Sequence, residues 1–96
     1  METPDVKPEP QSQQDAIINT VAWFAAEMRM KLYENRHKGG WRDCTTAYLL
    51  RRLLEEVGEL VEAQADGRQI SAEEAADVAN FCMMLADPSR KPKRGT

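Results

Sequence analysis

Two pairs of acidic residues in the second half of the chain have the spacing of a metal site. Glu56 and Glu59 lie in the stretch LLEEVGELVEA, and Glu74 and Asp77 lie in SAEEAADVANFCMML. Because residues three positions apart share one face of a helix, the two carboxylates of each pair project together, within about 6 Å. If the two helices form an antiparallel hairpin, the pairs can meet, and they would repel one another unless a cation lay between them. Such an all-oxygen site suits a hard divalent cation, Mg²⁺ first and Mn²⁺ second.

Simpler interpretations of the same acids stay open on the sequence. A charge run at helical spacing usually forms a solvated face, and Ser71 with Glu74 has the spacing of a capping box at the start of a helix. Against a solvated face, the helical line through Glu74 and Asp77 continues with Phe81 and Met84. A helix that is apolar on two sides is buried on two sides. The acids are therefore predicted to line a cleft between helices or subunits.

Three helices must position these residues. No strand pattern is present, and apolar residues recur at spacings of three and four through residues 15–35, 45–66 and 71–86. The predicted fold class is therefore all-α. The Pro-rich start and the basic end are predicted to be disordered, which divides the chain into an N-terminal segment, a helical domain and a tail: residues 1–14, 15–87 and 88–96.

Glycines and capping residues mark where these helices begin and end. The Gly39–Gly40 pair separates the first helix from the second, and Asp43 or Thr45 can cap the second. Gly67 ends that helix. Gly58, inside it, costs about 1 kcal/mol relative to alanine, so a close approach of a neighbouring helix is predicted there.

The helices carry more apolar surface than one small core uses. The first helix has two stripes on different sides, Ile17, Val21, Phe24, Ala25, Met28 and Leu32, and then Trp23, Ala26, Met30 and Tyr33. The second has an apolar stripe of Leu50, Leu53, Leu54, Val57, Leu60 and Val61, and a separate line of Leu49, Arg52, Glu56, Glu59 and Ala63. The stripe of the third is Ala75, Val78, Ala79, Cys82 and Ala86, with Cys82 as a small core residue. Because roughly 70 residues make only a small core, the chain is predicted to be an oligomer.

The composition narrows the class of protein further. A net charge of -3 gives no global basic field, which makes a nucleic-acid partner unlikely, and the basic tail is interpreted as a solubilising end. No apolar run is long enough to span a bilayer and no signal peptide is recognisable, so no membrane partner is expected. Two cysteines without a C-x-x-C motif favour a reducing cytoplasm. The single histidine, His37, lies outside the acidic stretches, which disfavours zinc and di-iron sites.

The acidic motifs also resemble a known family. EEVGE, followed after fourteen residues by EAAD, is similar to the E-E-x-x-E and E-x-x-D signature of the MazG-like all-α nucleoside triphosphate pyrophosphohydrolases, and the resemblance covers roughly residues 20–87. The short phage and prophage members are the most similar. The resemblance implies a three-helix protomer assembling into an oligomeric helical bundle, a homodimer or homotetramer. It also implies Mg²⁺-dependent cleavage of a nucleoside triphosphate, a deoxynucleotide in the phage-type members, to monophosphate and pyrophosphate.

The resemblance assigns a role to individual residues of this chain. The metal ligands are Glu56, Glu59, Glu74 and Asp77, and Glu55 is the candidate that positions or deprotonates the attacking water. The substrate-binding candidates are Lys38, Arg36 and Arg52 for phosphates, Trp41 for stacking on a base, and Asn80 for a hydrogen bond to the nucleotide. Trp41 as a core residue and Lys38 as a solvated lysine are the competing interpretations.

One departure from the family leaves alternatives open. Many relatives have a fourth helix after E-x-x-D, whereas here Pro88 follows the third helix directly. Either the assembly supplies the missing packing or this is a minimal member with altered activity. A non-catalytic helical interaction module and a phosphoribosyl-ATP pyrophosphatase-like enzyme on the same fold are the alternative functions.

Overall fold

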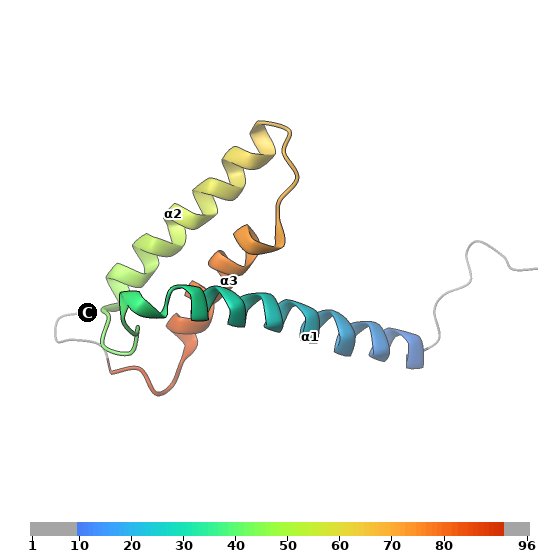
Figure 1. Ribbon diagram of the computed structural model, residues 1–96, viewed down its shortest axis with the longest axis horizontal. Helices are drawn as coiled ribbons and strands as arrows, with labels where there is room; N and C mark the ends of the chain where they lie inside the picture. The colour runs from blue at the N-terminus through green and yellow to red at the C-terminus, as the bar shows by residue number, and fades with distance from the viewer. Residues whose placement is uncertain (1–9, 92–96) are drawn as a thin grey trace, which may run out of the picture.

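The computed structural model describes residues 10–91, which form three α-helices and one short 3-10 helix (Figure 1). The elements are α1 (Pro10–Glu34), η1 (Arg36–Lys38), α2 (Thr46–Ala65) and α3 (Ala72–Ala86). No strand occurs within this range, which confirms the predicted all-α class.

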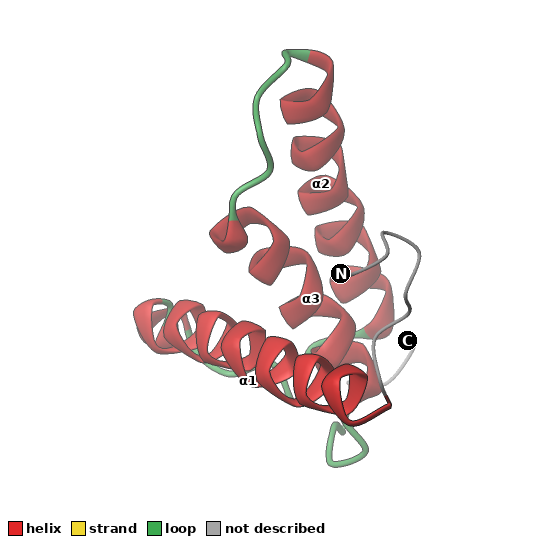
Figure 2. Ribbon diagram, turned by 90° about the vertical axis from the view of Figure 1, so that its right-hand side faces the viewer, coloured by secondary structure: helices red, strands yellow, loops and turns green. Residues whose placement is uncertain are grey.

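α3 is the central helix of the chain. It packs against α2 on one side and against α1 on the other (Figure 2). Within residues 10–91, α1 and α2 do not pack against each other, and the first half of α1 extends away from the other two helices (Figure 1). The chain is therefore an open arrangement of three helices and not a closed bundle.

The ends of the helical domain differ from the prediction. α1 begins at Pro10, so residues 10–14, assigned to a disordered segment, are helical. Proline is tolerated in the first turn because its missing N–H would have no partner there and its fixed φ already suits a helix. At the other end, residues 88–91 contact the loop before α2. The predicted disorder of residues 1–9 and 92–96 lies outside the described residues.

Local signals place the other helix ends where the sequence predicts them. The Thr45 hydroxyl, not Asp43, caps α2 by accepting a hydrogen bond from the Tyr48 N–H at 3.0 Å. After α2, Gly67 adopts a φ of 76°, a left-handed conformation that suits glycine. Arg68 N–H then donates to the Ala63 carbonyl at 2.8 Å and closes the helix end.

On α2 and α3 the fully buried side chains do not belong to the predicted apolar stripes. On α2 the fully buried residues are Leu49 and Ala63, the two ends of the line that carries the acids. Leu54, from the predicted apolar stripe, is 70% exposed. On α3 the buried residues are Ala76 and Asn80, while Cys82 is exposed, so its assignment to the core is wrong for the single chain. The small Ala76 side chain and the polar Asn80 face inward because α3 has a helix on both sides.

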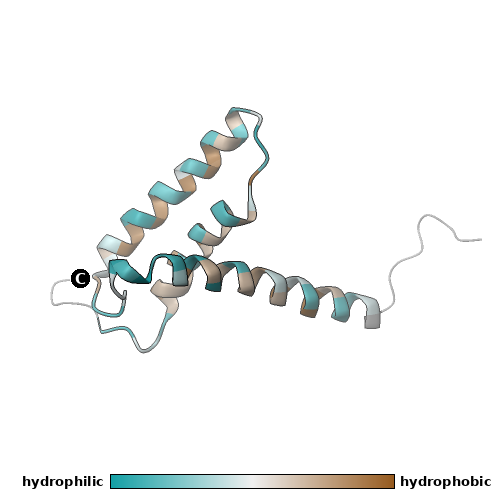
Figure 3. Cartoon of the chain, viewed as in Figure 1, coloured by the Kyte–Doolittle hydropathy of each residue, from teal (hydrophilic) through white to brown (hydrophobic). Residues whose placement is uncertain are grey.

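Much of the apolar surface stays exposed. The first stripe of α1 is half-buried only from Phe24 onward, whereas Ile17 and Val21 project beyond the other helices and are exposed. Trp23 and Tyr33, on the second side of α1, are also exposed. In Figure 3 apolar residues recur along the whole of α1 and α2. A single chain therefore covers only part of its apolar faces.

Gly58 has no close neighbour in the part of the chain that the structure describes. A Cβ atom built on it would meet no atom within 4 Å, so the predicted close approach of another helix is wrong for the single chain. Gly58 lies one turn from both Leu54 and Val61, on the exposed apolar face of α2.

No helix among residues 10–91 combines the length and the apolarity that a membrane span requires.

Candidate functional site

A cavity of about 660 Å³ lies where the end of α1, the following loop, α2 and α3 come together. Its lining includes seven of the residues that the sequence predicts to be functional: Arg36, Lys38, Trp41, Arg52, Glu56, Asp77 and Asn80. Glu55, Glu59 and Glu74 do not line it. The fold thus brings together residues from four separate segments of the chain.

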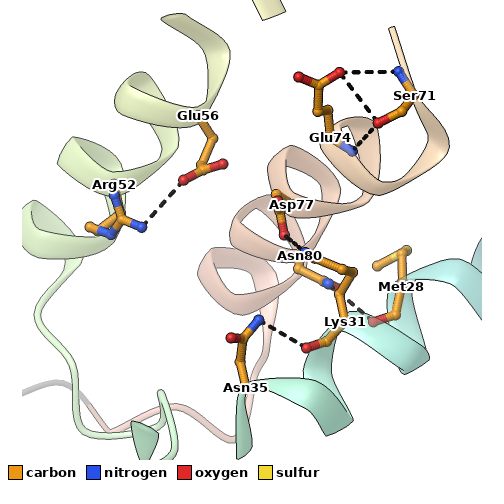
Figure 4. A network of polar contacts seen from close by, with 9 residues as sticks. All are labelled: Met28, Lys31, Asn35, Arg52, Glu56, Ser71, Glu74, Asp77 and Asn80. Carbon is orange, nitrogen blue, oxygen red and sulfur yellow. Dashed lines mark hydrogen bonds and ion pairs between the residues drawn. The ribbon is translucent and has the colours of Figure 1, made fainter. Parts of the chain in front are cut away.

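Two carboxylates reach this cavity from different helices. Glu56 comes from α2 and Asp77 from α3, and each has a basic partner (Figure 4). Arg52 Nη2 lies 3.3 Å from Glu56 Oε2, and Lys31 Nζ lies 3.6 Å from Asp77 Oδ1. The basic partners belong to different helices, Arg52 to α2 and Lys31 to α1. Each carboxylate of the cavity is therefore paired with a cation that also lines it.

Glu56 carries the electrostatic signature of converging acids. Its pKa is raised, first because burial penalises the charged carboxylate and then because the charges of Glu59 and Asp77 repel it. Arg52 offsets this only in part. Although Glu59 does not line the cavity, its charge contributes to the raised pKa of Glu56. These three acids therefore form the region of the site where a positive charge is most favourable.

Glu74 has a different environment from the other predicted metal ligands. Its side chain accepts hydrogen bonds from the Ser71 N–H at 3.2 Å and the Ser71 hydroxyl at 3.3 Å, while Glu74 N–H donates to the Ser71 hydroxyl at 3.0 Å. This is the capping box of α3, and Arg68 lies 3.6 Å from the carboxylate. The Ser71 backbone hydrogen bond is the first cause of the lowered pKa of Glu74. The capping interpretation of Glu74 is confirmed.

Glu55 and the predicted four-acid cluster also differ from expectation. Glu55 is exposed and forms an ion pair with Arg52, away from the cavity wall. Within residues 10–91, no group of three His, Cys, Asp or Glu side chains is close enough to hold a metal ion by itself. The cause is visible in Figure 4, since Glu56, Asp77 and Glu74 are each engaged by a neighbour in a different direction.

Asn80 is the most buried polar residue of the site, with 4% of its surface exposed. Its Nδ2 donates a hydrogen bond to the Met28 carbonyl at 3.1 Å, which fixes the orientation of the amide. Its Oδ1 is buried and accepts no hydrogen bond. A buried acceptor without a donor is costly, so Asn80 is suited to accept a hydrogen bond from a ligand.

Trp41 forms one wall of the cavity. The residue is half-buried, and its indole N–H donates to Asp87 Oδ2 at 3.0 Å. Arg36 and Lys38 lie on η1 just before it and are exposed to solvent. Both can therefore move toward an anion in the cavity without first breaking a buried contact.

The sequence patterns miss Lys31 and identify Phe81 only as a neighbour of the acids on the third helix. Lys31 lies in the apolar run between Met30 and Leu32, where a lone lysine is a weak signal for a half-buried ion pair. Phe81 lines the cavity, and the Arg52 guanidinium lies over its ring at 5.2 Å. This cation–π contact holds Arg52 against the cavity wall.

No protein-family model, no curated protein and no solved structure matches this chain. The chemistry of the site therefore rests on its own residues. Four cationic side chains, two carboxylates, three aromatic rings and a buried amide acceptor line one cavity. This combination suits a ligand that is anionic at one end and planar and polar at the other.

Proposed function

We propose that the protein is a Mg²⁺-dependent nucleoside triphosphate pyrophosphohydrolase that converts a deoxynucleoside triphosphate to the monophosphate and pyrophosphate. The observation that carries this proposal is the convergence of Trp41, Asn80, Glu56 and Asp77 with several cations in one cavity of about 660 Å³. The volume is in the range of small-molecule sites. The resemblance of EEVGE and EAAD to the MazG-like signature agrees with the proposal.

Different side chains of the cavity bind different parts of the substrate. Lys38, Arg36 and Arg52 bind the phosphates, for which guanidinium and ammonium groups are the usual partners. The Trp41 ring stacks on the base. Asn80 Oδ1 accepts a hydrogen bond from a donor of the base or the sugar, which satisfies an atom that has no partner among residues 10–91.

The acids of the site fit a hard divalent cation in part. Glu56 and Asp77 line the cavity, and Glu59 adds a charge that raises the pKa of Glu56. These three residues would have to move closer together to hold Mg²⁺, since no three acids of residues 10–91 form a ready metal site. Glu74 lies one turn before Asp77 on α3, and it would have to leave Ser71 to join them. Mg²⁺ supplies charge neutralisation on the phosphates and a more acidic bound water.

Glu55 is the proposed residue that positions the attacking water. It is exposed and its neighbour Arg52 holds it by an ion pair, so it can turn toward the cavity when Arg52 binds a phosphate. No covalent nucleophile is needed, because positioning and charge stabilisation account for most of the catalysis of phosphoryl transfer.

The working form is proposed to be a homodimer or homotetramer. The support is the exposed apolar face of α2 around Leu54 and Val61, together with Trp23 and Tyr33 on α1. Gly58 lies on the same face of α2, and the open space beside it would let a partner helix approach closely. Exposed patches of this kind mark interaction surfaces.

A second candidate function follows from the same exposed surface. A non-catalytic helical interaction module would also expose apolar faces, although it leaves the buried Asn80 acceptor without a role. Millimolar Mg²⁺ separates the two, because a metal-binding active site is stabilised by its ion and a packing module is not.

The proposed function is tested by turnover of matched variants. Asp77→Asn, which removes a carboxylate from the cavity, is expected to abolish hydrolysis while leaving the fold intact. Glu62→Gln is the matched control, since Glu62 is an exposed acid on the same helix as Glu56 and lines no part of the cavity. Equal activity of the two variants would contradict the proposal. Trp41→Ala should raise KM more than it lowers kcat, because stacking holds substrate and transition state about equally.

A further inference from the structure

The segment after α3 is tied to the loop that carries Trp41. α3 ends at Ala86, and Asp87 follows as its C-cap in an extended conformation, as expected for a residue before proline. The Asp87 Oδ2 atom accepts the indole hydrogen bond of Trp41 at 3.0 Å, a contact between residues 46 positions apart. Asp87 does not line the cavity itself. Within residues 10–91, Trp41 is the one contact of the Asp87 carboxylate that lines the cavity.

The carboxylate of Asp87 is itself held in place. Its other oxygen, Oδ1, accepts hydrogen bonds from the Ser89 N–H at 2.9 Å and the Ser89 hydroxyl at 2.7 Å. Arg42 Nε lies 3.5 Å from Oδ2. The Ser89 hydrogen bonds, followed by those from Trp41 and the charge of Arg42, lower the pKa of Asp87 to about 2. Asp87 is thus a permanently charged acceptor with a fixed orientation, which fixes the indole in turn.

A second tie runs from the same segment to the start of α2. Arg90 donates to the Cys44 carbonyl at 2.9 Å and to the Thr46 hydroxyl at 2.8 Å. Lys91 N–H donates to the Arg42 carbonyl at 2.6 Å. The loop is therefore held at Arg42 and at Cys44, two positions that closely follow Trp41.

Trp41 borders two hollows of the surface. Trp41 and Gly40 line both the main cavity and a second, shallower hollow whose wall includes Ser89 and Lys91. An indole that lost its hydrogen bond to Asp87 would no longer be held in one orientation toward a ligand in the main cavity.

We propose that Asp87 is a positioning residue for the nucleotide, which fixes the Trp41 ring as the stacking wall and so sets the affinity of the cavity for the base. The inference rests on the proposed function for the identity of the ligand. The hydrogen bond between Asp87 and Trp41, called the clasp below, is present in the free protein and can be tested without a ligand.

The first experiment measures the clasp without any nucleotide. In a Trp23→Phe background Trp41 is the single tryptophan, so its fluorescence reports on this ring alone. Asp87→Ala should make Trp41 more accessible to quenching by acrylamide and shift its emission to longer wavelength. Unchanged quenching and emission would overturn the positioning role.

The second experiment measures nucleotide turnover in the full chain with Mg²⁺. Asp87→Ala should raise KM about tenfold, as expected for the loss of one charge-assisted hydrogen bond, with kcat changed less than about twofold. Asp87→Asn keeps an acceptor oxygen for the indole and should recover most of the affinity. Arg42→Gln, which removes the ion pair of a largely exposed side chain but not the indole hydrogen bond, should raise KM less than Asp87→Ala does.

A double-mutant cycle shows whether Asp87 acts through Trp41. Trp41→Phe keeps an aromatic ring but has no N–H to donate. In that background Asp87→Ala should raise KM no further. A full tenfold rise there, or an unchanged KM in a protein whose Trp41 has become accessible, would overturn the proposal. A wild-type chain that neither binds nor turns over nucleotides would instead refute the proposed function, and the quenching result would still decide the clasp.

Discussion

The exposed apolar face of α2 gives the sharpest quantitative prediction for self-association. Leu54 is 70% exposed in the single chain, so an interface that covers it removes most of its side chain from water. Burying a leucine contributes about 2 kcal/mol. A twofold-symmetric dimer contains the residue twice, so Leu54→Lys should weaken association by about 4 kcal/mol, which is roughly 10²- to 10³-fold in Kd. In a monomer the same exposed substitution would change stability by less than about 0.5 kcal/mol.

The assay is sedimentation or light scattering over a series of protein concentrations. The wild-type chain should remain a dimer or larger at micromolar concentration, and Leu54→Lys should dissociate there. Gln64→Lys is the matched control, because Gln64 is an exposed polar residue on the same helix that belongs to no apolar stripe. A well-folded wild-type monomer at micromolar concentration, or equal behaviour of the two variants, would refute the reasoning.

Three further predictions concern the helix cap and the acids. Ser71→Ala should lower the free energy of unfolding by about 1 kcal/mol, whereas Glu74→Gln should keep the stability, since glutamine also completes a capping box. Thermal unfolding of the two variants checks this, and an equal loss of stability in both would contradict the capping role of Ser71. Because the pKa of Glu56 is raised by burial, Glu59 and Asp77, its favourable contribution is present at acidic pH and lost as the pH rises through that raised pKa. Glu56→Gln should therefore become more stable relative to wild type toward neutral pH, and a difference independent of pH would be the contrary result. Millimolar Mg²⁺ should raise the Tm of the wild type and raise that of Asp77→Asn less, and an equal rise would argue against Asp77 as a ligand.

Local patterns account for the helices of this chain. Period and caps are encoded in neighbouring residues, so the second and third helices and the roles of Thr45, Ser71 and Gly67 could be predicted. The start of α1 could not, because a proline is common both in the first turn of a helix and in disordered segments.

The inward faces were harder to predict, for a tertiary reason. The most apolar stripe of α2 is not the one that α3 covers, and α3 turns Ala76 and Asn80 inward because it lies between two helices. Alanine and asparagine add little to the apolar periodicity of a helix, so this pattern does not reveal that Ala76 and Asn80 are buried. The choice of face depends on helix crossings, which no single segment encodes.

The residues of the candidate site that belong to a sequence motif could be predicted. The residues that depend on contacts between distant parts of the chain could not. Glu56, Asp77, Asn80 and Trp41 do meet in one cavity. Trp41 and Asp87 are far apart in the chain, and no sequence motif or helical spacing predicts their hydrogen bond. The metal ligands and the reaction stay predictions.

Product analysis tests the proposed reaction most directly. The protein is incubated with Mg²⁺ and a panel of canonical and modified nucleoside triphosphates, and the products are separated by anion-exchange chromatography, with Asp77→Asn purified in parallel to exclude a contaminating phosphatase. Monophosphate and pyrophosphate in equal amounts, formed by the wild type and not by Asp77→Asn, are the predicted result. Diphosphate with orthophosphate would contradict the assigned reaction, and no turnover across the whole panel would contradict the enzyme itself and favour the interaction module.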